Sequence, residues 1–195
     1  MRRCGLDGCN RWTRWAECGL DHDLSEVTDE ELAVWDDGSL HDISLEQMEE
    51  MLADPAAERD FILEAATAWS PVVRRMVARR HVLPREIQMI LARDPDEGVQ
   101  MILVNRPDID GSILDTLSYS HSAAVRRVVA SRFTLWVPTQ MRLACDESPD
   151  VVSTLVVNLT ALDSVILLAT HNSDESVSSE ADTTMLRRLR QNISH

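Results

Sequence analysis

The chain has 195 residues, 44% of them hydrophobic, and a formal net charge of −14. The hydrophobic share is enough for a sizeable core, but only 4% of the residues are aromatic, which suits thin layers of aliphatic helices better than a wide globular core. No apolar run approaches the length of a membrane-spanning helix, and no hydrophobic signal segment follows Met1. The composition therefore predicts a cytoplasmic protein with no membrane-embedded part.

The negative charge is concentrated near the N-terminus. Residues 1–60 contain 5 Arg and 17 acidic residues, a net charge of −12, whereas residues 61–147 carry a net +1 and residues 148–195 a net −3. This acidic third indicates a protein partner with a basic surface, approached by residues 21–60. All 19 basic residues are Arg, which indicates a GC-rich bacterial or phage genome.

Three cysteines and a histidine near the N-terminus have the spacing of a metal site. Cys4, Cys9, Cys18 and His22 follow the pattern C-x4-C-x8-C-x3-H, which supplies the four donors of a tetrahedral Cys3His site. Zinc suits these donors, and so short a segment has too little core to fold without a metal. We therefore predict a zinc-binding module over residues 1–27. Free thiols are the alternative interpretation, since one cysteine pair lacks the usual two-residue spacing.

An acidic stretch separates this module from the rest of the chain. Residues 28–43 begin with a capping box from Thr28 to Glu31 and contain six acidic residues. This pattern predicts a connecting helix or linker with a solvated surface. The remaining residues, 44–195, form a third region with an internal repeat.

The third region repeats with a period of 26 residues. Five valines mark the period: Val73, Val99, Val125, Val151 and Val177. Three residues before each valine stands a Ser or Asp whose side chain can cap a helix: Ser70, Asp96, Ser122, Ser148 and Asp174. Apolar residues follow most of these valines at i+3 and i+4, which is the spacing of one buried helical face. Self-similarity at this period predicts stacked helical units and argues against a catalytic pocket.

Each unit is predicted to contain two helices. The first helix should end seven residues after the valine, because loops with proline follow there. The residues at this point are Arg80, Arg106, Arg132 and Asn158. A second apolar set, such as Ile87, Ile90 and Leu91, predicts a shorter second helix that ends before the next cap.

The two ends of the array depart from the repeat. Glu50 and Glu180 stand where inner units have Met76, Ile102, Val128 and Thr154. Polar substitution of an outward stripe is what the terminal units of an array need to stay soluble. A final helix around Met185–Arg190 is expected to close the array.

In these repeats the chain resembles the leucine-rich repeat variant family, a HEAT-like type of helical repeat. Units of that family read approximately as Leu-Ala-x-Asp, then Val-Arg-x-x-Val-Ala-x-Asn, then a turn with proline. The first element is matched by Leu91-Ala92-Arg93-Asp94 and by Leu143-Ala144-Cys145-Asp146, and the second by residues 73–78 and 125–130. The resemblance covers roughly residues 44–182 and implies a right-handed superhelix. The expected fold is therefore all-α, a right-handed α-solenoid of about five to six two-helix units after a small metal-binding module.

The resemblance also implies an alternative cofactor. A member of the family carries a cysteine-bound four-iron, four-sulfur cluster in an N-terminal region, and such a cluster normally takes four thiolates. The N-terminal segment offers three thiolates and His22, unless the distant Cys145 joins them. Cys145 lies at the repeat position of Arg93, which favours a role as a repeat residue. Zinc is therefore the predicted metal and an iron–sulfur cluster the alternative.

Several arginines recur at matching positions of the repeat. Arg74 and Arg75 are echoed by Arg126 and Arg127, and Arg79 lies one helical turn further on. Stacking would align these five guanidinium groups as a track for phosphate or carboxylate groups, so they are the candidate partner-binding residues. The alternative is ion pairing within the array, and the near-neutral middle of the chain favours it. The acids that would serve as partners are Asp94, Asp96 and Asp146.

No motif indicates an enzyme. The six histidines fall at different positions of the repeat, and no nucleophile motif, phosphate loop or paired-carboxylate spacing stands out. We therefore expect a non-catalytic protein-interaction module, a scaffold or an inhibitor, with a structural metal site. Two alternatives stay open. One is a nucleic-acid-binding repeat protein that uses the arginines, and the other is an inhibitor whose acidic third mimics DNA.

Overall fold

The computed structural model describes residues 44–193. In this range the chain forms eleven helices and no strand, which confirms the prediction of an all-α fold. Residues 1–43, which include the predicted metal-binding module (1–27) and connecting segment (28–43), lie outside the described residues. No helix between residues 44 and 193 is both long and apolar enough to span a membrane.

Two kinds of helix alternate along the chain, and each kind recurs every 26 residues. The first helices of the units are α2 (Leu45–Ala53), α4 (Pro71–Arg79), α6 (Glu97–Val104), α8 (Ala123–Ala130), α10 (Pro149–Val157) and α12 (Glu175–Ile193). The second helices are α3 (Arg59–Ala66), α5 (Arg85–Leu91), α7 (Gly111–Leu117), α9 (Val137–Ala144) and α11 (Asp163–Ala169). Every helix thus starts 26 residues after its equivalent, as the valine spacing predicts. We number the units 1 to 5, from α2–α3 to α10–α11, and α12 ends the array.

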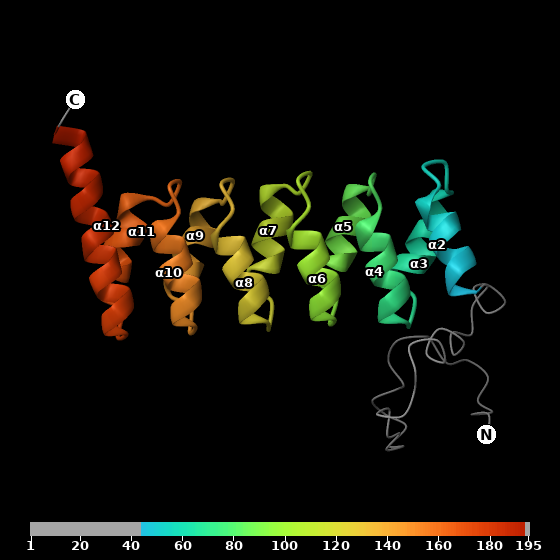
Figure 1. Ribbon diagram of the computed structural model, residues 1–195, viewed down its shortest axis with the longest axis horizontal. Coiled ribbons are helices and arrows are strands. Elements are labelled where there is room, and N and C mark those ends of the chain that lie inside the picture. The colour runs from blue at the N-terminus through green and yellow to red at the C-terminus, as the bar shows by residue number, and fades with distance from the viewer. Residues whose placement is uncertain (1–43, 194–195) are drawn as a thin grey trace, which may run out of the picture.

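The units lie side by side along one line (Figure 1). Each first helix contacts the next first helix, from α2 against α4 to α10 against α12. The second helices form another row, in which α3 contacts α5, α5 contacts α7, and α9 contacts α11. The five marker valines belong to one continuous hydrophobic core, and each is 5% exposed or less. Neighbouring units therefore bury each other's apolar faces, which a single unit cannot do alone.

The predicted caps lie at the starts of the first helices, but they do not all work in the same way. Asp96 and Ser122 accept hydrogen bonds from the backbone amides of Val99 (2.8 Å) and Val125 (3.4 Å). Ser70 and Ser148 occupy the N-cap position without a side-chain cap bond. Both precede a proline, which has no amide hydrogen to satisfy and restricts the backbone of the residue before it.

The last helix is longer than the sequence pattern indicates. The helix expected around Met185–Arg190 is the second half of α12, which runs without a break for 19 residues. No proline or glycine interrupts it, so nothing forces the turn that divides the other units. Arg188 anchors this half by donating to the backbone carbonyls of Asn158 (2.9 Å) and Ala161 (2.6 Å). Glu180, expected to be an outward end residue, is only partly exposed and accepts a hydrogen bond from the Ser153 hydroxyl.

Consecutive units are joined where their first helices end. The side chains of Arg80, Arg106, Arg132 and Asn158 each donate to backbone carbonyls of the preceding unit. Asn158 Nδ2, for example, lies 2.8 Å from the Ala130 carbonyl and 2.9 Å from the Arg132 carbonyl. The last carbonyls of a helix have no partner within that helix, so the next unit supplies the donors. We call this set of contacts the carbonyl ladder.

Two arginines of the carbonyl ladder differ in whether a carboxylate binds their guanidinium group. Arg106 forms a fork with Asp108, with Nε to Oδ1 at 2.9 Å and Nη2 to Oδ2 at 2.8 Å. The equivalent of Asp108 one unit earlier is Val82, and the Nε of Arg80 is buried without a hydrogen-bond partner among residues 44–193. Burial accordingly lowers the pKa of Arg80. Unit 2 therefore lacks a carboxylate that unit 3 provides.

Val82→Asp should supply this missing carboxylate. Val82 is 65% exposed, so the substitution removes little apolar burial. We expect the free energy of unfolding to rise by about 0.5–1 kcal/mol, because a buried donor gains a charged acceptor. Urea denaturation at neutral pH measures the change, and Val82→Asn is the control that adds a polar group without charge. An equal effect of Asn and Asp, or a loss of stability with Asp, would contradict the prediction.

Candidate functional site

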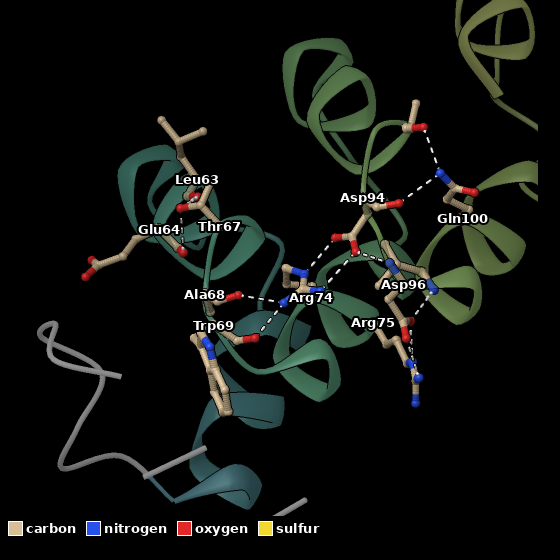
Figure 2. Close-up of polar contacts among 12 residues, drawn as sticks. Leu63, Glu64, Thr67, Ala68, Trp69, Arg74, Arg75, Asp94, Asp96 and Gln100 are labelled. Atoms are coloured by element: carbon tan, nitrogen blue, oxygen red, sulfur yellow. Dashed lines mark hydrogen bonds and ion pairs between the residues drawn. The ribbon is translucent and has the colours of Figure 1, made fainter. Parts of the chain in front are cut away.

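Two of the five candidate arginines point into the array. Arg74 forms a fork with Asp94, with Nε to Oδ2 at 2.6 Å and Nη2 to Oδ1 at 2.9 Å, and its Nη1 donates to the carbonyls of Ala68 and Trp69 (Figure 2). Arg126 binds Asp146 in the same way, at 2.7 and 2.9 Å. This hydrogen bond raises the pKa of Arg126. The side chains of Arg74 and Arg126 are only 11% and 8% exposed, so their charges are used inside the protein.

The residue at the position of Arg74 varies together with its partner 20 residues later. The three pairs are Arg74 with Asp94, Gln100 with Ser120, and Arg126 with Asp146; unit 5 has Val152, which cannot donate, and Asn172 at these positions. Where the donor is Gln100, its amide binds the backbone carbonyl of Asp94 at 2.9 Å and its oxygen accepts from Ser120 Oγ at 2.5 Å. A charged donor thus has a charged acceptor, and a neutral donor has a neutral one. This matching avoids an unpaired charge in a buried place.

A third candidate, Arg75, pairs at the surface. Its guanidinium binds both oxygens of Asp96, the N-cap of α6, at 2.9 and 2.8 Å. Hydrogen bonding from Arg75 is the main reason that the pKa of Asp96 is lowered. The arginine lies against Gly98, where a Cβ would come within 2.7 Å of Nε, so a larger residue there would shift the arginine side chain. The predicted pairing of the arginines with acids of the next unit is therefore confirmed for Arg74, Arg75 and Arg126.

The other two candidates, Arg79 and Arg127, are exposed. They share one face of the first helices with Arg75, at helix positions 2, 5, 6 and 9, which follow the i, i+3, i+4, i+7 spacing. We define the central face as these positions in units 2 to 4. Its residues are Val72, Arg75, Met76, Arg79, Gly98, Met101, Ile102, Asn105, Ala124, Arg127, Val128 and Ser131. Of the five arginines of the proposed track, two thus point into the array, and the other three, Arg75, Arg79 and Arg127, lie on the central face.

A second surface lies along the loops between first and second helices, which follow one another at the upper edge of Figure 1. In units 4 and 5 these loops expose four large apolar side chains, which we call the apolar loop patch. They are Phe133 (69% exposed), Trp136 (52%), Leu159 (83%) and Leu162 (39%). The two loops are neighbours, because Asn158 donates to the Arg132 carbonyl. Phe133 and Leu159 are equivalent by the repeat, as are Trp136 and Leu162.

Trp136 is held in place by the preceding unit. Its indole lies against Gly111 at the start of α7, where a Cβ would come within 2.4 Å of Nε1. Any other residue at position 111 would displace the ring. An aromatic side chain that is half exposed and fixed against the backbone is a typical anchor for a binding partner.

Sequence reasoning missed the apolar loop patch. Leu159 and Leu162 look like ordinary core residues in an aliphatic sequence, and Phe133 and Trp136 are separated by two residues without a helical stripe. The repeat does contain a signal that two of these positions are exposed. The positions of Phe133 and Trp136 hold Pro107 and Asp110 one unit earlier, which shows that both positions face solvent.

The predicted metal ligands Cys4, Cys9, Cys18 and His22 lie outside the described residues. Between residues 44 and 193, no group of three or more His, Cys, Asp and Glu side chains is arranged to hold a metal ion. Cys145 is exposed and forms the C-cap of α9.

Comparisons with models of protein families, with curated proteins and with solved structures each found no match to this chain.

The pairing of charged with charged and neutral with neutral residues predicts the outcome of a swap. Arg126→Gln alone should destabilise the protein by about 3 kcal/mol, because it leaves Asp146 buried without its cation. Adding Asp146→Ser reproduces the Gln100–Ser120 pair and should restore more than half of that loss. Chemical denaturation of wild type, both single variants and the double variant measures the coupling. Strictly additive effects of the two substitutions would contradict the prediction.

Proposed function

We propose that this protein is a cytoplasmic, non-catalytic interaction module that binds another protein. In this proposal, a right-handed α-solenoid of the leucine-rich repeat variant or HEAT-like type presents the binding surface. The observation that carries the proposal is the apolar loop patch. Four large apolar side chains, between 39% and 83% exposed, lie on two adjacent loops. Exposed apolar patches rimmed by polar residues commonly mark protein interaction sites.

The make-up of the patch supports a protein partner. Aromatic residues dominate the binding energy of protein interfaces, and Trp136 and Phe133 supply them here. Loops on a rigid scaffold are also the usual carriers of binding residues. The carbonyl ladder fixes the spacing of these loops, so the patch is organised before a partner arrives.

The internal use of arginine favours a protein partner over a nucleic acid. Arg74, Arg80, Arg106 and Arg126 bind carboxylates or carbonyls of the array and are at most partly accessible. Affinity for nucleic acid depends on the number of phosphates that cations neutralise. The exposed candidates that remain are Arg79 and Arg127, with Arg75 already paired to Asp96. An acidic segment that mimics DNA remains a second form of the protein-binding proposal.

We also propose that residues 1–27 bind zinc through Cys4, Cys9, Cys18 and His22. Three thiolates and one imidazole are a common donor set for structural zinc, whereas a four-iron cluster normally takes a fourth thiolate. Zinc would hold the short segment together in a position next to the acidic stretch that follows it.

Metal analysis tests the zinc proposal. Protein purified without oxygen should contain one zinc ion per chain, and Cys4→Ser with Cys9→Ser should abolish it, because too few donors remain. Elemental analysis and visible absorption spectroscopy measure this, and Cys145→Ser is the matched control with unchanged zinc. Broad visible absorption together with iron and sulfide would show an iron–sulfur cluster instead.

Polar substitution of the apolar loop patch tests the interaction proposal. Phe133→Ser with Leu159→Ser should reduce capture of partner proteins from a GC-rich bacterial lysate by roughly tenfold or more, because truncation of central anchors costs most of the binding energy. Affinity purification with quantitative mass spectrometry measures the loss. Both side chains are exposed, so the fold should be unaffected, which circular dichroism checks.

Val82→Ser is the matched control, since Val82 is also a well-exposed apolar residue, at 65%, on the loop of unit 2. Partners that are lost with the double substitution but kept with this control support the proposal. Equal capture by all three proteins would contradict it. Salt-sensitive retention of nucleic acid that disappears with Arg79→Glu and Arg127→Glu would favour the nucleic-acid alternative.

A further inference from the structure

The central face carries positive charge that no acid on the same face balances. Among its twelve residues are three arginines and no Asp or Glu. Arg75 is paired with Asp96 at the start of the next helix. Arg79 and Arg127 are exposed, and no carboxylate among the described residues pairs with them. In a chain with a net charge of −14, an acid-free face of this size needs an explanation.

The face has sharp boundaries. At the same helix positions, α2 carries Glu46, Glu49 and Glu50, α10 carries Asp150, and α12 carries Glu180. None of these three helices has an arginine at those positions. The positive charge is therefore confined to α4 and α8, with the uncharged face of α6 between them and acidic units on both sides.

The same three helices present a stripe of aliphatic residues. Met76, Met101, Ile102 and Val128 pack on the core and remain partly exposed. Methionine is flexible and adapts to the shape of an apolar partner. The central face thus offers apolar contact along its middle and guanidinium groups at Arg79 and Arg127. A segment with acidic and apolar residues would complement it.

The chain itself contains such a segment next to the face. Residues 21–43 include nine acidic residues and no Arg or Lys, together with Leu32 and Trp35 at i, i+3 spacing. The segment ends directly before Ser44, the N-cap of α2, and α2 contacts α4. Even at the short rise of about 1.5 Å per residue, 23 residues reach about 35 Å. Three helices packed about 10 Å apart span about 30 Å at most, so the segment can reach α8.

We propose that residues 21–43 dock on the central face, with their carboxylates paired to Arg79 and Arg127 and their apolar residues on the aliphatic stripe. Attachment to α2 gives the segment a local concentration in the millimolar range, so weak contacts are enough to hold it. The docked segment covers the exposed arginines, and an external acidic ligand has to displace it. The central face and the apolar loop patch lie on different residues.

Exposed ion pairs are weak and are screened by salt. Docking should therefore be strong at about 20 mM salt and lost at about 1 M, where the Debye length is about 3 Å.

The test measures how fast phenylglyoxal modifies individual arginines of the full-length protein at low salt, followed by mass spectrometry. In the wild type, Arg79 and Arg127 should react at least about threefold more slowly than in a variant with Asp29→Asn, Glu30→Gln, Glu31→Gln, Asp36→Asn and Asp37→Asn. Arg93 is exposed outside the central face and should react equally in both. High salt should remove the protection. Equal rates at Arg79 and Arg127 in wild type and variant would overturn the proposal.

A second measurement observes the segment instead of the face. A glutamate-specific protease cleaves after Glu26, Glu30 and Glu31, and docking should slow this cleavage in the wild type. Arg79→Glu with Arg127→Glu should accelerate cleavage severalfold, whereas Arg93→Glu should not. These variants keep the segment's own sequence, so a change in cleavage reports its contact with the face. Equal cleavage in the wild type and in both arginine variants would also overturn the proposal.

Discussion

The array depends on hydrogen bonds from one unit to the helix end of the preceding unit. The first helices of units 2 to 5 are only eight or nine residues long, so a large part of their carbonyls lies in the last turn without a partner in the same helix. These ends are buried between neighbouring units, where a missing partner is costly. Arg106, for example, donates to the Ala78 and His81 carbonyls of unit 2 and is itself 8% exposed. Each unit therefore needs its neighbour both to bury its apolar face and to hydrogen-bond the backbone carbonyls at its helix end. The carbonyl ladder fixes the distance between the two units.

The same constraint explains why so much of the positive charge is internal. A guanidinium group has five donors in a rigid plane, which lets one side chain reach two or three carbonyls and a carboxylate together. Burying it is costly unless a carboxylate accompanies it, and the repeat shows this in two independent places. Asp94 and Asp146 accompany Arg74 and Arg126, and a serine takes the acid's place where glutamine is the donor. Arg80 is the exception, with a buried Nε that no group in the described part of the chain satisfies.

Much of this architecture could be predicted from the sequence, because each weak signal of a helix start, cap or end occurs again in the following units. The valines, the cap residues and the ladder residues each recur at 26-residue intervals, and all helix starts follow them. The directions of the Arg74 and Arg75 side chains could not be predicted in this way. The two residues are adjacent in sequence and looked like one track, yet 100° of helical rotation sends one inward to Asp94 and the other outward to Asp96. The exposure of Phe133 and Leu159 was missed for a related reason, since apolar residues are normally assigned to the core.

The loops between first and second helices contain positions whose side chains are not needed for the contacts of the array. The first residue of each loop belongs to the carbonyl ladder and is held by the fold. The next residue is exposed in every unit from 2 to 5, where it is His81, Pro107, Phe133 and Leu159 in turn. Since no contact of the array needs that side chain, its identity can change without loss of stability. Large apolar residues are unfavourable at such sites in a protein that stays alone in water, because they expose apolar surface. The fold does not account for their presence in two neighbouring loops, beside a tryptophan fixed on Gly111, whereas the proposed binding of a partner does.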